Sequence, residues 1–207
     1  MFPKVYPITD VKLAGVSHAD QVSLLADGGA TFIQLREKNL PGSDFYREAK
    51  AALAIARQKG VALIINDRVD IALAIQAHGV HLGQDDLPPE AARKLLGNEA
   101  IIGYSTHNAA QAIAAATLPV DYIAVGPIFQ TGTKANPDSV VGLDGLKAVR
   151  KAIGHRHLVA IGGITQENAA AVIDAGADSV ALISALLLGG PTVISDRYRT
   201  LSGILSR

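Results

Sequence analysis

The stretch Asp121–Lys134, DYIAVGPIFQTGTK, carries the strand and loop pattern on which the expected fold depends. Residues 121–125 form a short apolar run bounded by Gly126 and Pro127, which is typical of a strand buried on both faces. The loop that follows ends in residues suited to an anion: Thr131, Gly132, Thr133 and Lys134. Two hydroxyl groups, a residue that permits close backbone approach and one positive charge fit a phosphate. The alternative is an ordinary surface loop, and recurrence of the pattern elsewhere in the chain decides between them.

The same alternation of strand and helix runs along the whole chain. The expected strands cover residues 5–9, 31–35, 61–65, 79–82, 100–103, 121–125, 157–161 and 178–183. The expected helices cover residues 18–27, 43–59, 69–77, 88–96, 107–116, 142–153, 165–175 and 191–205, with Ser43 as the N-cap of the second. Connections are short, and strands such as VALII and SVALI are nearly all apolar, as in parallel sheets covered by helices.

Eight such units in 207 residues predict an α/β protein that folds as a closed (β/α)8 TIM barrel, with one domain over residues 1–207. An open, doubly wound sheet is the alternative. That fold normally carries a glycine-rich fingerprint after its first strand, where this chain has Asp10 followed by Val11 and Lys12.

Composition excludes several classes of protein. The formal net charge is +0 and the pI is near 7.0, so nothing overall favours nucleic acid or a membrane surface. The absence of Cys excludes disulfides, thiolate metal sites and a Cys nucleophile. The N-terminal MFPKVYPITD lacks a signal-peptide pattern, and no run reaches the ~18 apolar residues of a membrane span. We therefore expect a soluble, cytoplasmic protein.

Polar side chains follow the expected strands, where the catalytic residues of TIM barrels lie. Gln34, Arg36 and Lys38 alternate after the second strand, so they are expected on one side of an extended segment with Glu37 turned away. Such a row is either an inward anion site or a solvated rim. We favour the anion site, because neighbouring inward cations are costly unless an anion joins them.

Two acidic positions follow the third and fourth strands. Asp67 and Asp86 are each interpretable as helix N-caps, but on adjacent strands they supply the oxygen ligands that Mg²⁺ takes one or two at a time. Spacing alone leaves Asp85 open as an alternative to Asp86.

The loops after the last two strands also suit a phosphate. Gly162 and Gly163 precede a helix expected near Thr165, and strand eight ends at Ile183 and Ser184. Barrels often bind phosphate there through backbone N–H groups and a helix dipole, and tight packing turns are the alternative. His107 is either an acid or base or a locally hydrogen-bonded residue, and His81, within a strand, is expected to be structural or to line the substrate site.

Seven segments of the chain, in order, together resemble the thiamine-phosphate synthase family. They are QLREK (34–38), NDRVDIA (66–72), GVHLGQDD (79–86), STHN (105–108), GPIFQTGTK (126–134), AIGGIT (160–165) and the Ile183–Ser184 exit. Members of that family join an aminopyrimidine methyl diphosphate to a thiazole phosphate and release diphosphate.

The resemblance implies a role for each matching position. The groups implied to hold the pyrimidine diphosphate are Gln34, at the pyrimidine, and Arg36, Lys38, Asn66, Ser105 and Lys134. Asp67 and Asp86 resemble the Mg²⁺ ligands, which resolves the choice against Asp85. The thiazole-phosphate contacts are implied to be Thr131, Thr133, Gly163, Ile183 and Ser184. Departures from the family pattern occur at Pro7, Asp85 and Ser179, and none removes a charge from the expected site.

Two other functions stay open at this stage. One is a barrel of the related thiazole tautomerase type, in which a His such as His107 is the acid and base. The other is a non-catalytic barrel that binds phosphorylated ligands, although such a sensor has no need of an acidic pair beside a row of cations. The expected partners are small molecules. A homo-oligomer is an open alternative to a monomer, because an apolar helix face packs equally well on a barrel or on another chain.

Overall fold

Eight parallel strands close into a barrel in the computed structural model, which describes residues 2–132 and 139–206. Each strand pairs with the next in the sequence, and β1 closes the ring by pairing with β8. The strands are β1 (Val5–Thr9), β2 (Phe32–Leu35), β3 (Ala62–Asn66), β4 (Gly79–Leu82), β5 (Ile101–Thr106), β6 (Tyr122–Val125), β7 (His157–Ile161) and β8 (Ser179–Leu182). The predicted (β/α)8 barrel is therefore confirmed.

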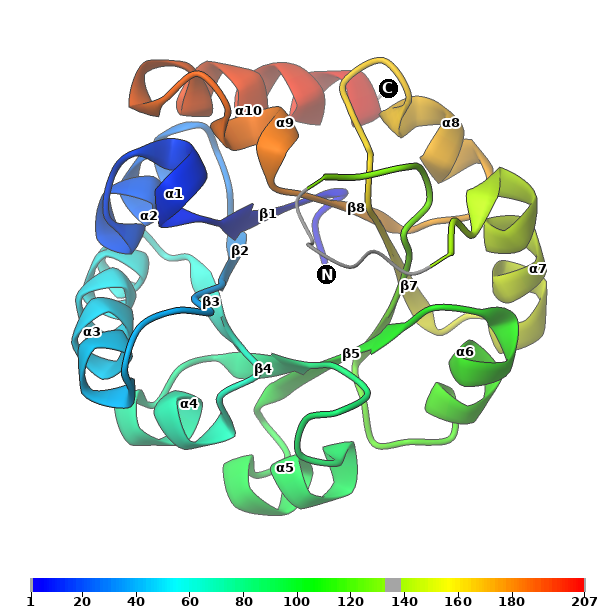
Figure 1. Cartoon of the computed structure of the whole chain (residues 1–207), viewed down its shortest axis with the longest axis horizontal. Coiled ribbons are helices and arrows are strands. Elements are labelled where there is room, and N and C mark those ends of the chain that lie inside the picture. Colours follow the sequence, from blue (N-terminus) through cyan, green and yellow to red (C-terminus); the bar gives the residue numbers. More distant parts are fainter. Residues whose placement is uncertain (1, 133–138, 207) are drawn as a thin grey trace.

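Helices form a ring around the barrel (Figure 1). The longer ones are α2 (His18–Asp27), α3 (Gly42–Gln58), α5 (Pro89–Leu96), α7 (Gly142–Ile153) and α10 (Pro191–Leu205). The shorter ones are α1 (Val11–Ala14), α4 (Val69–Ile75), α6 (Ala109–Ala115), α8 (Ala169–Asp174) and α9 (Ser184–Leu187). No helix within the described ranges is long and apolar enough to cross a bilayer.

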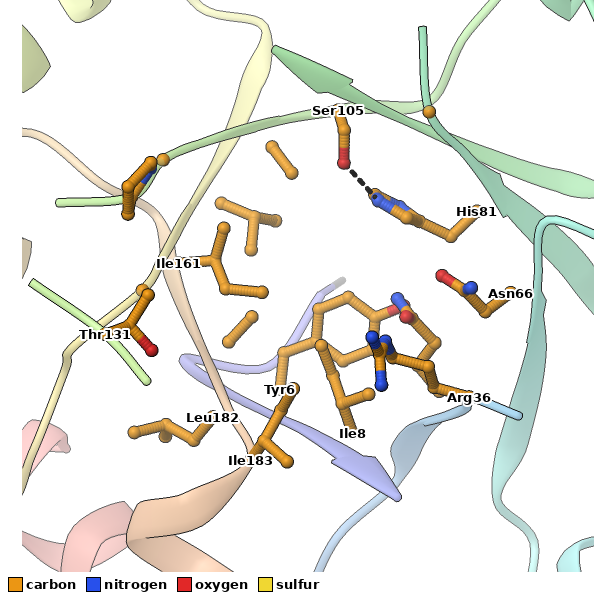
Figure 2. Close-up of a pocket in the computed structure, with 18 of the residues that line it drawn as sticks. Tyr6, Ile8, Arg36, Asn66, His81, Ser105, Thr131, Ile161, Leu182 and Ile183 are labelled. Atoms are coloured by element: carbon orange, nitrogen blue, oxygen red, sulfur yellow. Dashed lines mark hydrogen bonds between the residues drawn. The ribbon is translucent and has the colours of Figure 1, made fainter. Parts of the chain in front are cut away.

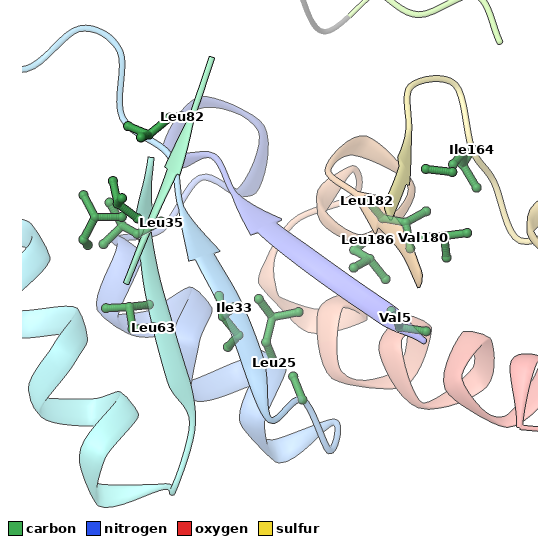
Figure 3. Close-up of a cluster of buried hydrophobic side chains, with 14 of the residues drawn as sticks. Val5, Leu25, Ile33, Leu35, Leu63, Leu82, Ile164, Val180, Leu182 and Leu186 are labelled. Carbon is green, nitrogen blue, oxygen red and sulfur yellow. The ribbon is translucent and has the colours of Figure 1, made fainter. Parts of the chain in front are cut away.

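The strands are apolar because both of their faces are buried. Outward side chains such as Ile33, Leu63 and Val180 pack beneath the helices in one continuous core (Figure 3). Inward side chains form a second cluster, which fills the barrel interior below the cavity. It includes Tyr6, Phe32, Ile64, Tyr122 and Val159. Toward the carboxyl ends of β2 to β5, the inward positions become polar, with Gln34, Asn66, His81 and Ser105, and they line the site described below.

Several predicted boundaries are wrong for local reasons. Ser43 is not an N-cap, because α3 begins one residue earlier, with Pro41 at the cap position. The helix expected near Thr165 begins at Ala169, because the Asn168 side chain accepts a hydrogen bond from Thr165 N–H and donates one to Gly163 O, which holds a turn there. Strand β5 extends to Thr106, so Ser105 lies within the strand and not after it.

Two short helices, α1 and α9, were not predicted from the sequence. Each has only four residues, which is too short to show a helical repeat of apolar side chains. Asp10 nevertheless caps α1 by accepting a hydrogen bond from Leu13 N–H at 3.0 Å.

Gly103 makes room for a large side chain inside the barrel. A Cβ atom added there would lie 2.0 Å from Tyr122 Cζ and 2.3 Å from the Tyr122 hydroxyl oxygen. We expect Gly103→Ala to lower the free energy of unfolding by about 2 kcal/mol, because the fully buried Tyr122 ring has to move. Chemical denaturation measures the difference. The control is Gly203→Ala in α10, where an added Cβ meets nothing within 4 Å and stability should not fall. Equal stability of Gly103→Ala and the wild type would contradict the prediction.

Candidate active site

A cavity of about 470 Å³ opens where the strands end. All of the predicted site residues that the structure describes line it: Gln34, Arg36, Lys38, Asn66, Asp67, Asp86, Ser105, Thr131, Gly163, Ile183 and Ser184. The other two, Thr133 and Lys134, lie outside the described residues. Figure 2 shows Arg36, Asn66 and His81 along one side of the cavity, and Thr131, Leu182 and Ile183 along the opposite side. The site thus has two distinct walls.

The cationic wall is built by the segment that leaves β2. Arg36 and Lys38 line the cavity, as the alternation predicts, and Glu37 is directed elsewhere. Glu37 Oε2 lies 3.5 Å from Nε2 of the buried His18, and Glu37 Oε1 accepts a hydrogen bond from Asn39 N–H at 2.6 Å. This contact anchors the segment from the outside, so that the residues on either side of Glu37 face inward.

Arg36 and Lys38 also have anionic partners in the protein. Arg36 Nη1 lies 3.7 Å from Asp10 Oδ2, and Lys38 Nζ forms an ion pair with the Asp67 carboxylate. The Lys38 side chain is still 49% exposed, so a ligand anion can reach it from the cavity.

Asp67 has an unusual backbone conformation at the exit of β3. Its φ angle is 62°, in the left-handed region that Asp and Asn adopt more readily than most residues. Its N–H donates a hydrogen bond to His81 O at 2.8 Å, which ties the exits of β3 and β4 together. Neither Asp67 nor Asp86 caps a helix, because Arg68 and Pro88 occupy those positions, so the capping alternative is wrong for both.

The two carboxylates approach each other closely. The pKa of Asp86 is raised, mainly by burial and also by the charge and hydrogen bond of Asp67. The hydrogen bond from Gly83 N–H at 2.7 Å acts in the opposite direction. Carboxylates that share a site repel each other unless a proton or a cation lies between them. Asp85, by contrast, is exposed at the rim of the cavity. Within the described residues, no group of three or more His, Cys, Asp or Glu side chains is placed to hold a metal. The pair instead fits Mg²⁺, which typically takes only one or two carboxylate ligands from the protein.

Asn66 presents an unsatisfied donor to the same cavity. The residue is 6% exposed, and its Nδ2 has no hydrogen-bond partner in the described part of the chain. Leaving a buried donor unpaired costs about 1–3 kcal/mol, which a ligand oxygen would recover.

The opposite wall combines backbone and hydroxyl groups. Gly162 and Gly163 have φ angles of 98° and 66°, which favour glycine. A Cβ added at Gly163 would lie 2.5 Å from Gln130 O, so only glycine lets this turn pack against the loop that leads to Thr131. Because α8 begins at Ala169, the predicted helix dipole is not directly beside this turn, and backbone and hydroxyl groups are the donors available there.

The two predicted histidine alternatives are resolved differently. Burial lowers the pKa of His81 to about 4, so its ring is neutral at pH 7 and lines the cavity floor. His107 is hydrogen-bonded locally. Its backbone N–H donates to Gln111 Oε1 at 2.7 Å, and its ring Nδ1 lies 3.0 Å from Gly126 O, although the residue also lines the cavity.

Two tyrosines of the site were missed by sequence analysis. Tyr6 lines the cavity and Tyr122 lies beneath it, and both are buried inside the barrel. The available signal was the period of two along each strand, which places Tyr6 on the same inward face as Ile8 and Tyr122 on the same face as Ala124. In a strand that is apolar on both faces, this alternation is hard to recognise.

Comparison with known proteins agrees with this geometry. Residues 5–186 match the family model described as thiamine monophosphate synthase. A thiamine-phosphate synthase of Chloroflexus aurantiacus is 46% identical over 185 residues, covering 89% of this chain and 85% of that protein. One of Clostridium novyi is 48% identical over 185 residues, covering 89% and 90%. The solved structure of thiamine phosphate pyrophosphorylase from Pyrococcus furiosus has a TM-score of 0.86 at 34% identity, covering 98% of this chain and 95% of that one. The chain therefore belongs to the thiamine monophosphate synthase family.

Proposed function

We propose that the protein is a thiamine-phosphate synthase, which couples an aminopyrimidine methyl diphosphate to a thiazole phosphate and releases diphosphate. The observation that carries this proposal is the cavity itself, which is lined by two cations and an acidic pair as well as by the hydroxyl groups of Thr131 and Ser184 and the turn at Gly163. Two phosphorylated substrates would thus lie side by side with their anionic groups apart. We further propose that residues 1–207 act as one domain, in the cytoplasm, on small molecules.

The cationic wall would hold the diphosphate. Arg36 and Lys38 face the cavity from one segment, and Asn66 and Ser105 add neutral hydrogen-bonding groups beside them. Gln34 lies deeper, where it would meet the pyrimidine ring. The assignment of Lys134 to the diphosphate remains a prediction from the sequence.

Asp67 and Asp86 would hold Mg²⁺. When bound there, the ion would neutralise charge on the diphosphate oxygens, which is the usual role of Mg²⁺ held by one or two carboxylates. Its charge would also offset the burial and the Asp67 repulsion that raise the pKa of Asp86. Lys38, now paired with Asp67, would become available to the diphosphate.

The opposite wall would hold the thiazole phosphate. Thr131 and Ser184 supply hydroxyl groups, and the turn at Gly163 brings backbone close to the ligand. Ile183 would pack against the thiazole ring, and Thr133 is assigned here from the sequence alone.

In the reaction, the bond between the exocyclic methylene and the diphosphate oxygen breaks, and the bonding electrons leave with the diphosphate. The electron-rich aminopyrimidine stabilises the methylene cation, and the thiazole nitrogen lone pair then forms the new carbon–nitrogen bond. No nucleophilic side chain is needed. The protein has to stabilise the charge that grows on the leaving group, which is the task of Arg36, Lys38 and their neighbours.

The test is to incubate the purified protein with both substrates, with and without Mg²⁺, and to measure thiamine phosphate by mass spectrometry and diphosphate by a coupled assay. We expect equal amounts of both products, which should depend on both substrates and on Mg²⁺. A protein that isomerises the thiazole without releasing diphosphate would instead be a tautomerase. A protein that binds both ligands without turnover would be a sensor, and either result would contradict the proposal.

A further inference from the structure

Five buried or half-buried polar side chains form a continuous hydrogen-bonded chain across the barrel. Gln34 Nε2 lies 3.0 Å from the Tyr6 hydroxyl, and that hydroxyl lies 2.8 Å from the Tyr122 hydroxyl. His81 Nδ1 lies 2.9 Å from the Tyr122 hydroxyl, and His81 Nε2 lies 2.8 Å from Ser105 Oγ. The last of these hydrogen bonds is visible in Figure 2. The chain thus begins and ends at two residues assigned to the pyrimidine diphosphate.

The direction of the first links follows from proton counting. Gln34 Nε2 carries only donors, so the Tyr6 oxygen accepts from it. Tyr6 has one proton left to donate, and Tyr122 is the other hydroxyl bonded to it in the described part of the molecule. Tyr122 therefore accepts from Tyr6 and donates its own single proton onward. If Tyr122 donated to Tyr6 instead, the Tyr6 proton would have no acceptor among the described side chains, and an unpaired buried donor is unfavourable.

The onward links are set by the neutral imidazole of His81. A neutral imidazole has one nitrogen that accepts and one that donates. Because Tyr122 donates to Nδ1, the proton of the ring is on Nε2, and Nε2–H donates to Ser105 Oγ. The Ser105 oxygen is thus occupied as an acceptor, and its own O–H is left to donate into the cavity that it lines.

We propose that Tyr6, Tyr122 and His81 are positioning residues that fix the donor and acceptor roles of Gln34 and Ser105 before substrate binds. This inference rests on the proposed function. At one end, Gln34 uses its amino group on Tyr6, so its carbonyl oxygen is the group that it offers to a ligand amino group. At the other end, Ser105 offers a proton, which suits a diphosphate oxygen that can only accept. The two ends of the chain therefore match the amino group and the diphosphate of one substrate.

The tautomer of His81 tests the direction without any change to the site. Long-range proton–nitrogen NMR spectra of the wild type at pH 7, with the His81 signals assigned by their loss in His81→Gln, report which nitrogen carries the proton. We expect the Nε2–H tautomer. The Nδ1–H tautomer would mean that the chain runs in the opposite direction, and it would overturn the inference.

Tyr122→Phe tests the consequence for binding, because Tyr122 lies below the cavity and does not line it. We expect the KM for the pyrimidine diphosphate to rise about tenfold, because the loss of one correctly oriented hydrogen bond to a charged group has about this effect. The KM for the thiazole phosphate should not change. The matched control is Tyr198→Phe, at another buried tyrosine, whose hydroxyl donates a hydrogen bond to Val5 O at 3.4 Å and lies outside the chain of hydrogen bonds described above. That variant should leave both constants unchanged.

Two results of these kinetics would count against the inference. They are an unchanged KM for the pyrimidine diphosphate in Tyr122→Phe, and equal rises in both KM values, which would indicate general loosening of the barrel. Failure of the proposed function is distinguishable from both, because the wild type itself would then release no diphosphate.

Discussion

Asp67→Asn is expected to lower kcat by about 100-fold or more while the protein stays folded. The substitution removes one of the two carboxylates proposed to hold Mg²⁺ and leaves the shape of the side chain unchanged. Loss of one well-aimed electrostatic group typically costs about 2.7 to 4 kcal/mol of barrier, which corresponds to this fall in rate. Asn also tolerates the left-handed backbone at this position, where φ is 62°, so backbone strain should not contribute.

The measurement is steady-state release of diphosphate over a range of Mg²⁺ concentrations, with circular dichroism to confirm folding. Asp85→Asn is the matched control, because Asp85 lines the same cavity but lies exposed beside Asp86. We expect that control to retain turnover within a few-fold of the wild type. Wild-type kcat in Asp67→Asn, or equal losses in the two variants, would refute the role of the acidic pair.

The second large effect is on the pH dependence of stability, and it comes from His81. Burial, opposed by the nearby Asp67 charge and assisted by Lys38, lowers the pKa of His81 from 6.5 to about 4. Below pH 6.5 the unfolded chain therefore binds a proton that the native state does not, so stability falls as the pH decreases toward 4. Between pH 7 and pH 4.5 we expect this one residue to cost about 2.5 kcal/mol of unfolding free energy.

Urea denaturation at several pH values, for the wild type and His81→Gln, measures this contribution. EDTA in all samples keeps metal away from the neighbouring Asp67. The wild type should lose about 2.5 kcal/mol more than the variant over this range, whatever the variant's stability at pH 7. Parallel curves for the two proteins would show that His81 is not a neutral, buried residue in the native state.

Local patterns in the chain predicted much of the site. The period of two after β2 predicted that Arg36 and Lys38 face the cavity and that Glu37 does not, and the contact between Glu37 and His18 explains why. The rule that barrel chemistry lies at strand ends brought Asp67, Ser105 and Ser184 to one cavity. Boundaries were less accurate, as at Ser43 and Thr165, because a neighbouring side chain or a proline decides where a helix begins.

The sequence by itself determined the repeated units of the barrel and the polar character of each strand end, because both depend on residues close together in the chain. Only the tertiary structure decided which polar groups meet. Tyr6 and Tyr122 are 116 residues apart, and the space that Gly103 leaves inside the barrel is visible only once the ring has closed. Asp86 is distinguished from Asp85 by its approach to Asp67 across two strand exits. Such pairings depend on the closure and register of the strands, which no local pattern specifies.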